Sequence, residues 1–353
     1  MRAARMHGYN QPLVIEDVPV PSIEPEEVLV RVQAAGMCRT DVQMVDGYFT
    51  GLKLPFPATP GHEIAGVVAS LGSAVPASAG LAVDDQVVVV GGYGCGACPQ
   101  CHVGNHQICA NGRWPGFGLY GGYSEYVPVP YQWLIRLSKD DHLKPEELAP
   151  LTDAGLTPYR GLKKLQAAGV LRSNNVVAVI GVGGLGTYGV QYAKLLSGGA
   201  TVVALARSDE KLKAAKELGA DATINVRGKS SDEVRKELKR QTGHTEFNAV
   251  LDCSGAEEAI RLGFELLATS GAFASVGLIG TRAEIPLFPF VAREYSYYGS
   301  FWGNYVDLSE VIELARKRLI RHEINLVKFE DVNENLNKLR DGDFVGRAVM
   351  TFP

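Results

Sequence analysis

The pattern of hydrophobic and polar positions divides the chain near residue 150. Before that point, short strand-like runs occur at Val28–Val32, Glu63–Val68 and Gln86–Val90, and turns rich in glycine and proline separate them. Short valine-rich runs bounded by such turns are typical of β-strands. The first part of the chain is therefore predicted to be mostly β.

After residue 150 the pattern alternates between strands and helices. Val176–Ile180 is continuously apolar, as expected for a strand that is buried on both faces. Thr201–Ala206 predicts another strand and Asp209–Leu218 an amphipathic helix, and strands follow at Ala249–Asp252 and Gly271–Val276. This alternation of strands and helices indicates a doubly wound parallel sheet.

The end of the chain adds a helix predicted at Leu308–Leu319 and a closing strand predicted at Ala348–Phe352. A length of 353 residues exceeds one typical core and indicates two domains. We expect an α/β protein with a mostly β domain formed by residues 1–153 and 304–353. Residues 154–303 are expected to form the doubly wound, dinucleotide-binding domain.

The charge balance excludes some classes of partner. Lys and Arg number 35 and Asp and Glu number 39, which gives a net charge of −4. This balance does not favour nucleic acid or an anionic membrane as a partner. The first residues, MRAARMHGYN, contain no apolar signal segment, and no apolar run is long enough to span a membrane. We therefore expect a cytoplasmic protein.

Four of the six cysteines lie close together in the sequence. Within the lobe of residues 91–110, glycines and a proline interleave Cys95, Cys98, Cys101 and Cys109. Four thiolates complete a tetrahedral zinc site and leave no position for substrate, so this spacing predicts a structural zinc. The alternative is a loop of reduced thiols without metal. His102 and His106 lie inside the lobe and are expected to be surface residues rather than ligands.

A glycine-rich turn follows the strand Val176–Ile180. Its sequence is Gly181-Val182-Gly183-Gly184-Leu185-Gly186, and a helical pattern comes next. The first glycine suits a tight turn, the second lets the backbone approach a pyrophosphate, and the third lets helix and strand pack closely. The helix N-terminus offers free N–H groups to the anion. The alternative is a tight turn that binds no ligand.

The end of the second strand bears on the choice between NAD and NADP. The position where an acid would bind the ribose 2′-hydroxyl is Ala206, and Arg207 and Ser208 follow it. Arg207 can pair with a 2′-phosphate and Ser208 can donate a hydrogen bond to it. Alternatively, Ser208 is the N-cap of the next helix, and Asp209 bends back to the ribose. We expect NADP to be preferred, with NAD as the alternative.

Two further motifs carry a resemblance to a known family. Gly61-His62-Glu63-x2-Gly66-x5-Gly72-x2-Val75 and Gly36-Met37-Cys38-Arg39-Thr40-Asp41 precede the cysteine lobe and the glycine-rich turn. In this order, the motifs resemble those of the zinc-containing medium-chain alcohol dehydrogenases, above all the shorter microbial and archaeal members. The resemblance covers essentially the whole chain. It implies a GroES-like catalytic domain, a Rossmann domain, and hydride transfer between NAD(P) and an alcohol–carbonyl pair with zinc as Lewis acid.

The resemblance also implies a catalytic zinc held by Cys38, His62 and Asp153. Many family members have a cysteine at the third position, and a carboxylate is an acceptable zinc ligand there. By the same resemblance, Glu63 lies behind the metal and can coordinate it during ligand exchange. Asp41 is expected to orient His62 through its second ring nitrogen. Alternatively, Cys38 and His62 pack in the core, and Glu63 and Asp41 are surface or fold-stabilising carboxylates.

Three residues near the first ligand have implied roles. Thr40 is placed to pass on the proton of the zinc-bound oxygen. Many relatives continue this relay through a histidine where this chain has Gln43, so the relay is expected to continue through water. Arg39 matches a residue that contacts the pyrophosphate, although it could equally be a solvated surface arginine.

Substrate and assembly are also implied by the resemblance. The substrate pocket is expected to be lined by Phe49, Trp114, Leu278 and Phe301, which suit an apolar substituent. The same residues could instead be ordinary core. The segment Tyr295–Trp302 resembles the strand that joins family members into dimers, so a homodimer or homotetramer is expected.

Three other functions compete with this interpretation. A related reductase without catalytic zinc would lack the intact ligand set. A zinc-ribbon module that binds nucleic acid would cluster Lys and Arg around its cysteines, and this chain does not. A polyol dehydrogenase shares the chemistry and would be favoured if Glu63 were a permanent ligand.

Overall fold

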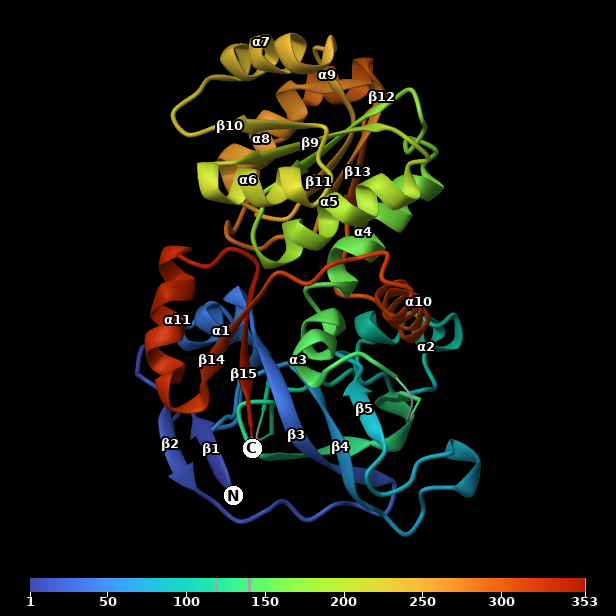
Figure 1. The fold of residues 1–353 in the computed structure, drawn as a ribbon, viewed down its shortest axis with the longest axis vertical. Helices are drawn as coiled ribbons and strands as arrows, with labels where there is room; N and C mark the ends of the chain where they lie inside the picture. The colour runs from blue at the N-terminus through green and yellow to red at the C-terminus, as the bar shows by residue number, and fades with distance from the viewer. Residues whose placement is uncertain (119, 139–140, 353) are drawn as a thin grey trace. The chain divides into compact units, whose positions relative to one another are not determined.

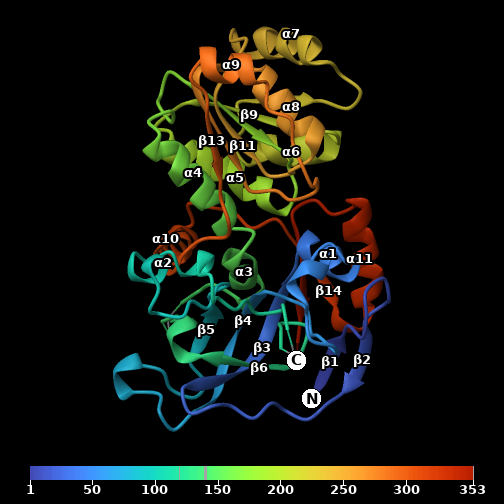
Figure 2. The same cartoon turned by 180° about the vertical axis from the view of Figure 1, so that it is seen from behind.

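The computed structural model describes residues 1–118, 120–138 and 141–352, and the chain divides into two compact units. Unit 1 comprises Met1–Leu156, Trp302–Leu319 and Ile324–Pro353, and unit 2 comprises Thr157–Phe301 and Ile320–Glu323. Figure 1 shows their elements from one side, and Figure 2 shows them from the opposite side.

Unit 1 is built on a seven-stranded sheet. Its strands are β3 (Glu27–Met37), β4 (Glu63–Leu71), β5 (Gln86–Val89), β6 (Tyr126–Pro130), β7 (Leu134–Arg136), β14 (Ile324–Lys328) and β15 (Arg347–Thr351). They follow the order β14-β15-β3-β4-β5-β7, and β6 also pairs with β3. The β14–β15 pair is parallel and the others are antiparallel. A separate antiparallel pair joins β1 (Arg2–Arg5) and β2 (Val14–Asp17).

The helices of unit 1 are short. They are α1 (Arg39–Val45), α2 (Pro99–His102), α3 (Pro145–Leu148), α10 (Tyr305–Arg316) and α11 (Val332–Asp341), with 3-10 turns at Thr50–Leu52, Ala77–Ala79, His106–Ile108, Tyr131–Trp133, Ala149–Thr152 and Phe329–Asp331. Along β3, buried positions first alternate with half-buried ones, and then every residue is buried at the carboxyl end. Strand β3 therefore delivers the residues that follow it, beginning with Cys38, into the interior.

Unit 2 contains a six-stranded parallel sheet in the order β10-β9-β8-β11-β12-β13. Its strands are β8 (Val176–Ile180), β9 (Thr201–Ala206), β10 (Ala222–Asn225), β11 (Phe247–Asp252), β12 (Leu267–Ser275) and β13 (Ser296–Gly299). All five residues of β8 are buried, because a central parallel strand is covered by helices on both faces.

The helices of unit 2 are α4 (Leu156–Ala167), α5 (Gly184–Leu196), α6 (Asp209–Glu217), α7 (Ser231–Thr242), α8 (Glu257–Glu265) and α9 (Leu287–Ala292). Helices α5 and α6 lie in front of the sheet in Figure 1, and α8 lies on the other face in Figure 2. The chain order reverses between β8 and β11. In open parallel sheets, ligands bind at such a switch point, beyond the carboxyl ends of the strands.

The predicted fold class is confirmed. The mostly β first part, the doubly wound parallel sheet and the closing strand are all present, and β8 and β9 have the predicted bounds. The late helix occupies Tyr305–Arg316 and thus begins earlier than Leu308, because Asn304 caps it by accepting a hydrogen bond from the Asp307 N–H at 2.8 Å. No helix in the described ranges is long and apolar enough to cross a lipid bilayer.

Candidate functional site

The three predicted ligands of a catalytic zinc come together in unit 1. Cys38 is the N-cap of α1, His62 directly precedes β4, and Asp153 follows the 3-10 turn Ala149–Thr152. All three are buried, and one ligand atom of each lies within 4.8 Å of the others. The Oδ2 atom of Asp153 lies 3.4 Å from Sγ of Cys38 and 3.5 Å from Nε2 of His62.

A buried ion pair stands behind these ligands. Arg347 of β15 donates to Oε2 of Glu63 from Nε at 2.9 Å, and its Nη2 lies 2.9 Å from Oδ2 of Asp153. Glu63 also accepts a hydrogen bond from the Ala154 N–H at 2.8 Å. A Cβ at Gly36 would lie 1.7 Å from the Glu63 carboxylate, so only glycine leaves room for Glu63 there. Arg347 was not among the residues predicted from the sequence.

The charges of this cluster fit a divalent cation. With Cys38 as a thiolate, Asp41, Asp153 and Glu63 bring the negative charges to four, against one positive charge on Arg347 and one on His62, which is protonated without a metal. The remaining excess of two negative charges is buried, where unpaired charge is costly. A thiolate, an imidazole and a carboxylate at this spacing are the ligand types of zinc sites with an open fourth position. The residues present therefore fit the ion that the resemblance implies.

The ionisation of the cluster reflects its burial. Burial raises the pKa of Glu63 to about 7, against the lowering effect of the Arg347 guanidinium. Burial opposes the charged form of His62, but the negative charges of Asp41 and Cys38 outweigh it and raise the pKa of His62 well above its ordinary value. Without a metal, His62 therefore carries a proton at neutral pH.

Asp41 and Tyr123 lie behind His62 and Cys38. Oδ1 of Asp41 lies 3.2 Å from Nδ1 of His62, the ring nitrogen that faces away from Asp153. The other oxygen of Asp41 accepts hydrogen bonds from the Cys38 N–H at 2.8 Å and the Tyr123 hydroxyl at 2.7 Å. Burial and the charge of Asp41 raise the pKa of Tyr123, so this hydroxyl stays a donor. Tyr123 had no motif to reveal it in the sequence.

Aromatic side chains surround His62. The Trp302 ring meets the imidazole edge-on at 5.3 Å, and the Phe117 ring lies 6.0 Å away. Of the predicted pocket residues, Phe49 and Trp114 pack against Phe117 at 5.7 and 5.8 Å. The other two, Leu278 and Phe301, belong to unit 2 and are 45% and 41% exposed in the chain. The sequence analysis missed both Trp302 and Phe117.

Helix α1 carries the residues that follow Cys38. Arg39 donates from Nη1 to the carbonyl oxygens of Leu339 and Arg340 at 3.3 and 2.8 Å, at the end of α11. Thr40 and Gln43 are half-buried on the same helix. Arg39 is thus partly used in holding α11 rather than fully solvated, and its remaining N–H donors stay available.

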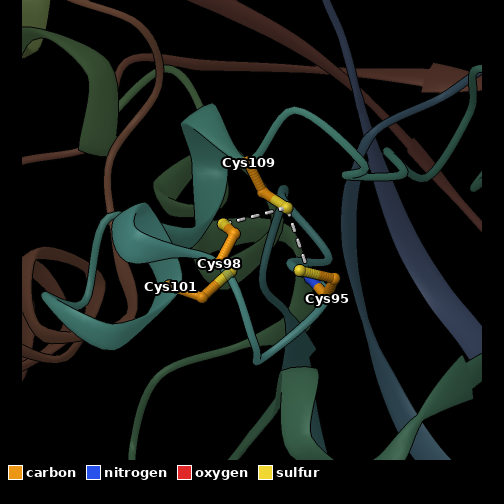
Figure 3. A group of neighbouring side chains, drawn as sticks. All are labelled: Cys95, Cys98, Cys101 and Cys109. Atoms are coloured by element: carbon orange, nitrogen blue, oxygen red, sulfur yellow. Dashed lines mark hydrogen bonds between the residues drawn. The ribbon is translucent and has the colours of Figure 1, made fainter.

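The four clustered cysteines form a second site in unit 1 (Figure 3). Their sulfur atoms lie within 4.8 Å of one another, and Cys98 and Cys109 approach to 3.7 Å. The Ala97 N–H lowers the pKa of Cys95 to about 7, and the Cys101 N–H lowers the pKa of Cys98. Burial raises the pKa of Cys101 to about 11, so backbone N–H groups favour the thiolate, the form that binds zinc, at Cys95 and Cys98 only.

The two histidines of the lobe differ in exposure. His102 is exposed, as predicted. The prediction that His106 is a surface residue is wrong, because it is only 5% exposed and packs on Trp133 at 4.5 Å. Burial of an aromatic ring against tryptophan outweighs the polarity of the imidazole here. Neither histidine belongs to the four-sulfur group.

The glycine-rich turn of unit 2 has the expected geometry. Gly181 has a positive φ of 90° directly after β8, and Gly183 is the N-cap of α5. A Cβ at Gly186 would lie 2.0 Å from the Gly181 carbonyl oxygen, whereas a Cβ at Gly183 would meet no atom within 4 Å. Gly186 therefore permits close packing of helix and strand, and the backbone at Gly183 is open to a ligand. Gly184 and Leu185 form the first turn of α5.

No acid ends strand β9. Ala206 is its last residue, Arg207 is exposed, and Ser208 is the N-cap of α6 without a side-chain capping bond. The Asp209 carboxylate accepts a hydrogen bond from Nδ2 of Asn225 at 2.6 Å. Nε of Arg227 donates to the Arg207 carbonyl at 2.9 Å, which brings a second guanidinium to this strand end. The sequence analysis missed Arg227 because it lies twenty residues further on.

A buried carboxylate organises the loops on the other side of the switch point. Asp252 ends β11 and accepts hydrogen bonds from the Ser254 N–H, the Gly255 N–H and the Ser275 hydroxyl at 2.9 to 3.4 Å. A Cβ at Gly255 would lie 2.2 Å from the Gly277 carbonyl oxygen. Asp252 therefore holds the loops after β11 and β12 in tight contact.

Comparisons with known proteins identify the family to which the chain belongs. Residues 24–139 match the family model of the alcohol dehydrogenase GroES-like domain, and residues 184–317 match that of the zinc-binding dehydrogenases. A NAD-dependent alcohol dehydrogenase of Sulfurisphaera tokodaii is 35% identical over 99% of both chains. The chain belongs to the zinc-binding alcohol dehydrogenase family.

Other relatives show the breadth of this family. A D-arabinose 1-dehydrogenase (NADP(+)) of Saccharolobus solfataricus is 33% identical over 99% of this chain and 97% of its own. The crystal structure of an alcohol dehydrogenase from Aeropyrum pernix superposes with a TM-score of 0.92 at 36% identity, over the full length of both chains.

Family membership confirms the class of activity predicted from the sequence. The protein is a zinc-dependent alcohol dehydrogenase, an oxidoreductase that acts on a hydroxyl group. The comparisons give the polyol-dehydrogenase and zinc-ribbon alternatives no better support.

Proposed function

We propose that this alcohol dehydrogenase transfers hydride between a nicotinamide cofactor and a secondary or aromatic alcohol, with a catalytic zinc held by Cys38, His62 and Asp153. The convergence of these three ligand atoms within 4.8 Å carries the proposal. When bound there, zinc supplies Lewis acidity that stabilises negative charge on the substrate oxygen.

The surrounding residues of the chain orient and balance this site. Asp41 holds His62 in the orientation in which Nε2 faces Asp153, as carboxylates commonly do for metal-binding histidines. Arg347 neutralises Glu63 and also donates a hydrogen bond to Asp153. Glu63 therefore lies behind the ligands and is not a permanent ligand of the metal. This arrangement favours an alcohol dehydrogenase over a polyol dehydrogenase.

Proton movement is assigned to Thr40. Its hydroxyl lies on the first turn of α1, two residues after Cys38, and can both accept and donate a proton. Gln43 lies one turn further, and an amide cannot act as a base at neutral pH. The proton therefore leaves Thr40 towards water. The rings of Phe117 and Trp302 pack near His62 and add apolar surface to the site.

A structural zinc is proposed for the second site. Cys95, Cys98, Cys101 and Cys109 offer four sulfur ligands and leave no open position, so this zinc takes no part in the reaction. The full metal content is then two zinc ions per chain.

Unit 2 is proposed to bind the dinucleotide, and unit 1 is proposed to be the catalytic domain. The pyrophosphate is assigned to the backbone of Gly181, Gly183 and Gly184 at the start of α5. The Gly181 N–H donates to the Leu205 carbonyl oxygen at 2.8 Å, so the N–H groups offered to the anion are those of the first turn of the helix. Arg39 remains the predicted partner of the pyrophosphate from unit 1. The adenosine half is assigned to the end of β9 and the nicotinamide half to the loops after β11 and β12, because a dinucleotide spans the switch point.

NADP is proposed as the preferred cofactor. An acid that would accept the ribose 2′-hydroxyl and repel a 2′-phosphate is replaced by Ala206. Arg207 is exposed, Arg227 is hydrogen-bonded to its carbonyl, and the Ser208 hydroxyl makes no capping bond. Two guanidinium groups and a hydroxyl at one strand end suit a phosphate.

The substrate pocket and the subunit assembly are also proposed. Phe49, Trp114, Leu278 and Phe301 are proposed to line an apolar substrate pocket. The edge strand β13 lies within Tyr295–Trp302 and is proposed to join two subunits, as part of a homodimer or homotetramer. A cytoplasmic location is proposed with them.

A panel of alcohols assayed with both cofactors tests the proposed function. We expect oxidation of simple secondary and aromatic alcohols, faster with NADP than with NAD, and loss of activity after removal of zinc by a chelator. Absence of turnover with either cofactor in zinc-replete protein would refute the proposal. A strong preference for NAD would refute only the role of Arg207.

A further inference from the structure

Trp302 has an unusual backbone conformation for a bulky residue. Its φ is 50°, in the left-handed region that favours glycine, and its side chain is only 5% exposed. A non-glycine residue stays in this region only where its surroundings hold it firmly, and such positions cluster at functional sites. The contacts of Trp302 therefore indicate which function its strained backbone conformation serves.

Those contacts connect Trp302 to two of the proposed zinc ligands. Its indole Nε1–H donates to the Thr152 carbonyl oxygen at 2.9 Å in a buried hydrogen bond. Thr152 directly precedes Asp153 and ends the 3-10 turn that presents it. The indole ring also meets the imidazole of His62 edge-on, at 5.3 Å and an interplanar angle of 82°.

The neighbouring backbone is shaped to hold the indole in this place. A Cβ at Gly91 would lie 2.1 Å from the Trp302 ring, so glycine is required there. A Cβ at Gly303 would lie 2.3 Å from the Leu156 side chain, so the residue after Trp302 is also confined. Both glycines and the indole belong to unit 1, like the ligands themselves.

We propose that Trp302 is a positioning residue of the catalytic zinc site: its N–H fixes the Thr152 carbonyl, and with it Asp153, while its ring edge fixes the plane of His62. This inference rests on the proposed function, because it takes Cys38, His62 and Asp153 as the ligands. Tryptophan suits the role because it combines a large apolar ring with an N–H donor and has no acceptor that could compete for the metal.

The hydrogen bond and the ring contact can be separated by substitution. Trp302→Phe keeps an aromatic ring against His62 but removes the donor to Thr152. Trp302→Leu removes both. Trp133→Phe is the matched control, because Trp133 is a half-buried tryptophan of unit 1 that packs on His106 and makes no contact with the three ligands in the described interactions.

The readout is the ligand field of the metal rather than activity alone. Co²⁺ is exchanged into the catalytic site of the full-length protein, and its visible spectrum and its rate of release to a chelator are recorded for each variant, together with kcat and KM. Substitutions behind metal ligands typically cost roughly ten- to a hundredfold in metal affinity or activity. We expect Trp302→Phe to shift the Co²⁺ bands and weaken Co²⁺ binding roughly tenfold, and Trp302→Leu to do so more strongly.

The outcomes separate this inference from the function on which it rests. Trp133→Phe should leave the Co²⁺ spectrum unchanged. If Trp302→Phe folds, binds Co²⁺ and gives the wild-type spectrum and release rate, Trp302 is not a positioning residue. If wild-type protein shows no Co²⁺ band that disappears in Cys38→Ser, the proposed zinc ligands themselves are wrong.

Discussion

The buried Arg347 guanidinium is expected to stabilise the folded protein by pairing with Glu63. Arg347 is 3% exposed and faces Glu63, which is fully buried, through hydrogen bonds from Nε and Nη2. Replacing it with methionine preserves much of the volume but leaves the Glu63 carboxylate without its partner. Removing one member of a buried ion pair typically costs about 3–5 kcal/mol. For a domain of about this size, that cost corresponds to a fall of roughly 6–20 °C in Tm.

The pH dependence of this loss follows from the pKa of Glu63. Burial raises that pKa to about 7, and Arg347 is the group that opposes the rise. In Arg347→Met the pKa of Glu63 therefore moves still higher. The raised pKa means that the protonated carboxyl is favoured in the folded state, so stability is lost as pH rises. The loss of unfolding free energy in the variant, relative to wild type, should accordingly be larger at pH 8 than at pH 6. These values lie on either side of the wild-type pKa of Glu63.

Thermal unfolding at fixed zinc concentration measures this prediction. The matched double variant Arg347→Met/Glu63→Gln removes both charges of the pair, and such replacements are often nearly neutral. We expect the double variant to recover most of the lost Tm and to lose the extra dependence on pH. A single variant within about 1 kcal/mol of wild type, or a double variant less stable than the single one, would refute the reasoning.

Three further predictions concern the cofactor and the metal. Arg207→Ala should weaken NADPH binding about tenfold or more, by loss of a charge-assisted bond, and leave NADH unchanged in a fluorescence titration; equal losses would contradict it. Asp252→Asn should weaken NADPH roughly tenfold but not ADP-ribose, which lacks the nicotinamide held by the loops after β11 and β12; parallel losses would assign Asp252 to the fold alone. Zinc uptake by metal-free protein should release protons and tighten as pH rises from about 6 to 8, because His62 and the protonated cysteine ligands must lose their protons; calorimetry in two buffers of different ionisation enthalpy measures this, and no release would contradict zinc binding by these residues.

Much of the fold was predictable because local pattern and tertiary role coincide. The run Val176–Ile180 is apolar throughout because the strand is central, so the pattern gave its bounds without error. The glycines after it are required by positive φ at Gly181 and close packing at Gly186, and both constraints are visible as glycine in the sequence. Helix ends were less certain, since the cap at Asn304 decides one of them.

The site was only partly predictable because its supporting groups come from distant segments. Sequence motifs revealed Cys38 and His62, because these residues adjoin the paired strands β3 and β4. Arg347 reaches Glu63 from a strand near the end of the chain, and Tyr123 reaches Asp41 from a loop, so neither shares a motif with its partner. The available signal was an arginine directly before the apolar residues of the closing strand, Arg347–Thr351.

Cys38, His62 and Asp153 are proposed to hold a catalytic zinc, separate from a structural zinc at the four cysteines. Counting zinc per chain in purified wild-type protein and in Cys38→Ser tests this proposal most directly. We expect two zinc ions per chain in wild type, and one in the variant together with loss of alcohol oxidation. One zinc in wild type, or two in an inactive or active Cys38→Ser protein, would contradict it.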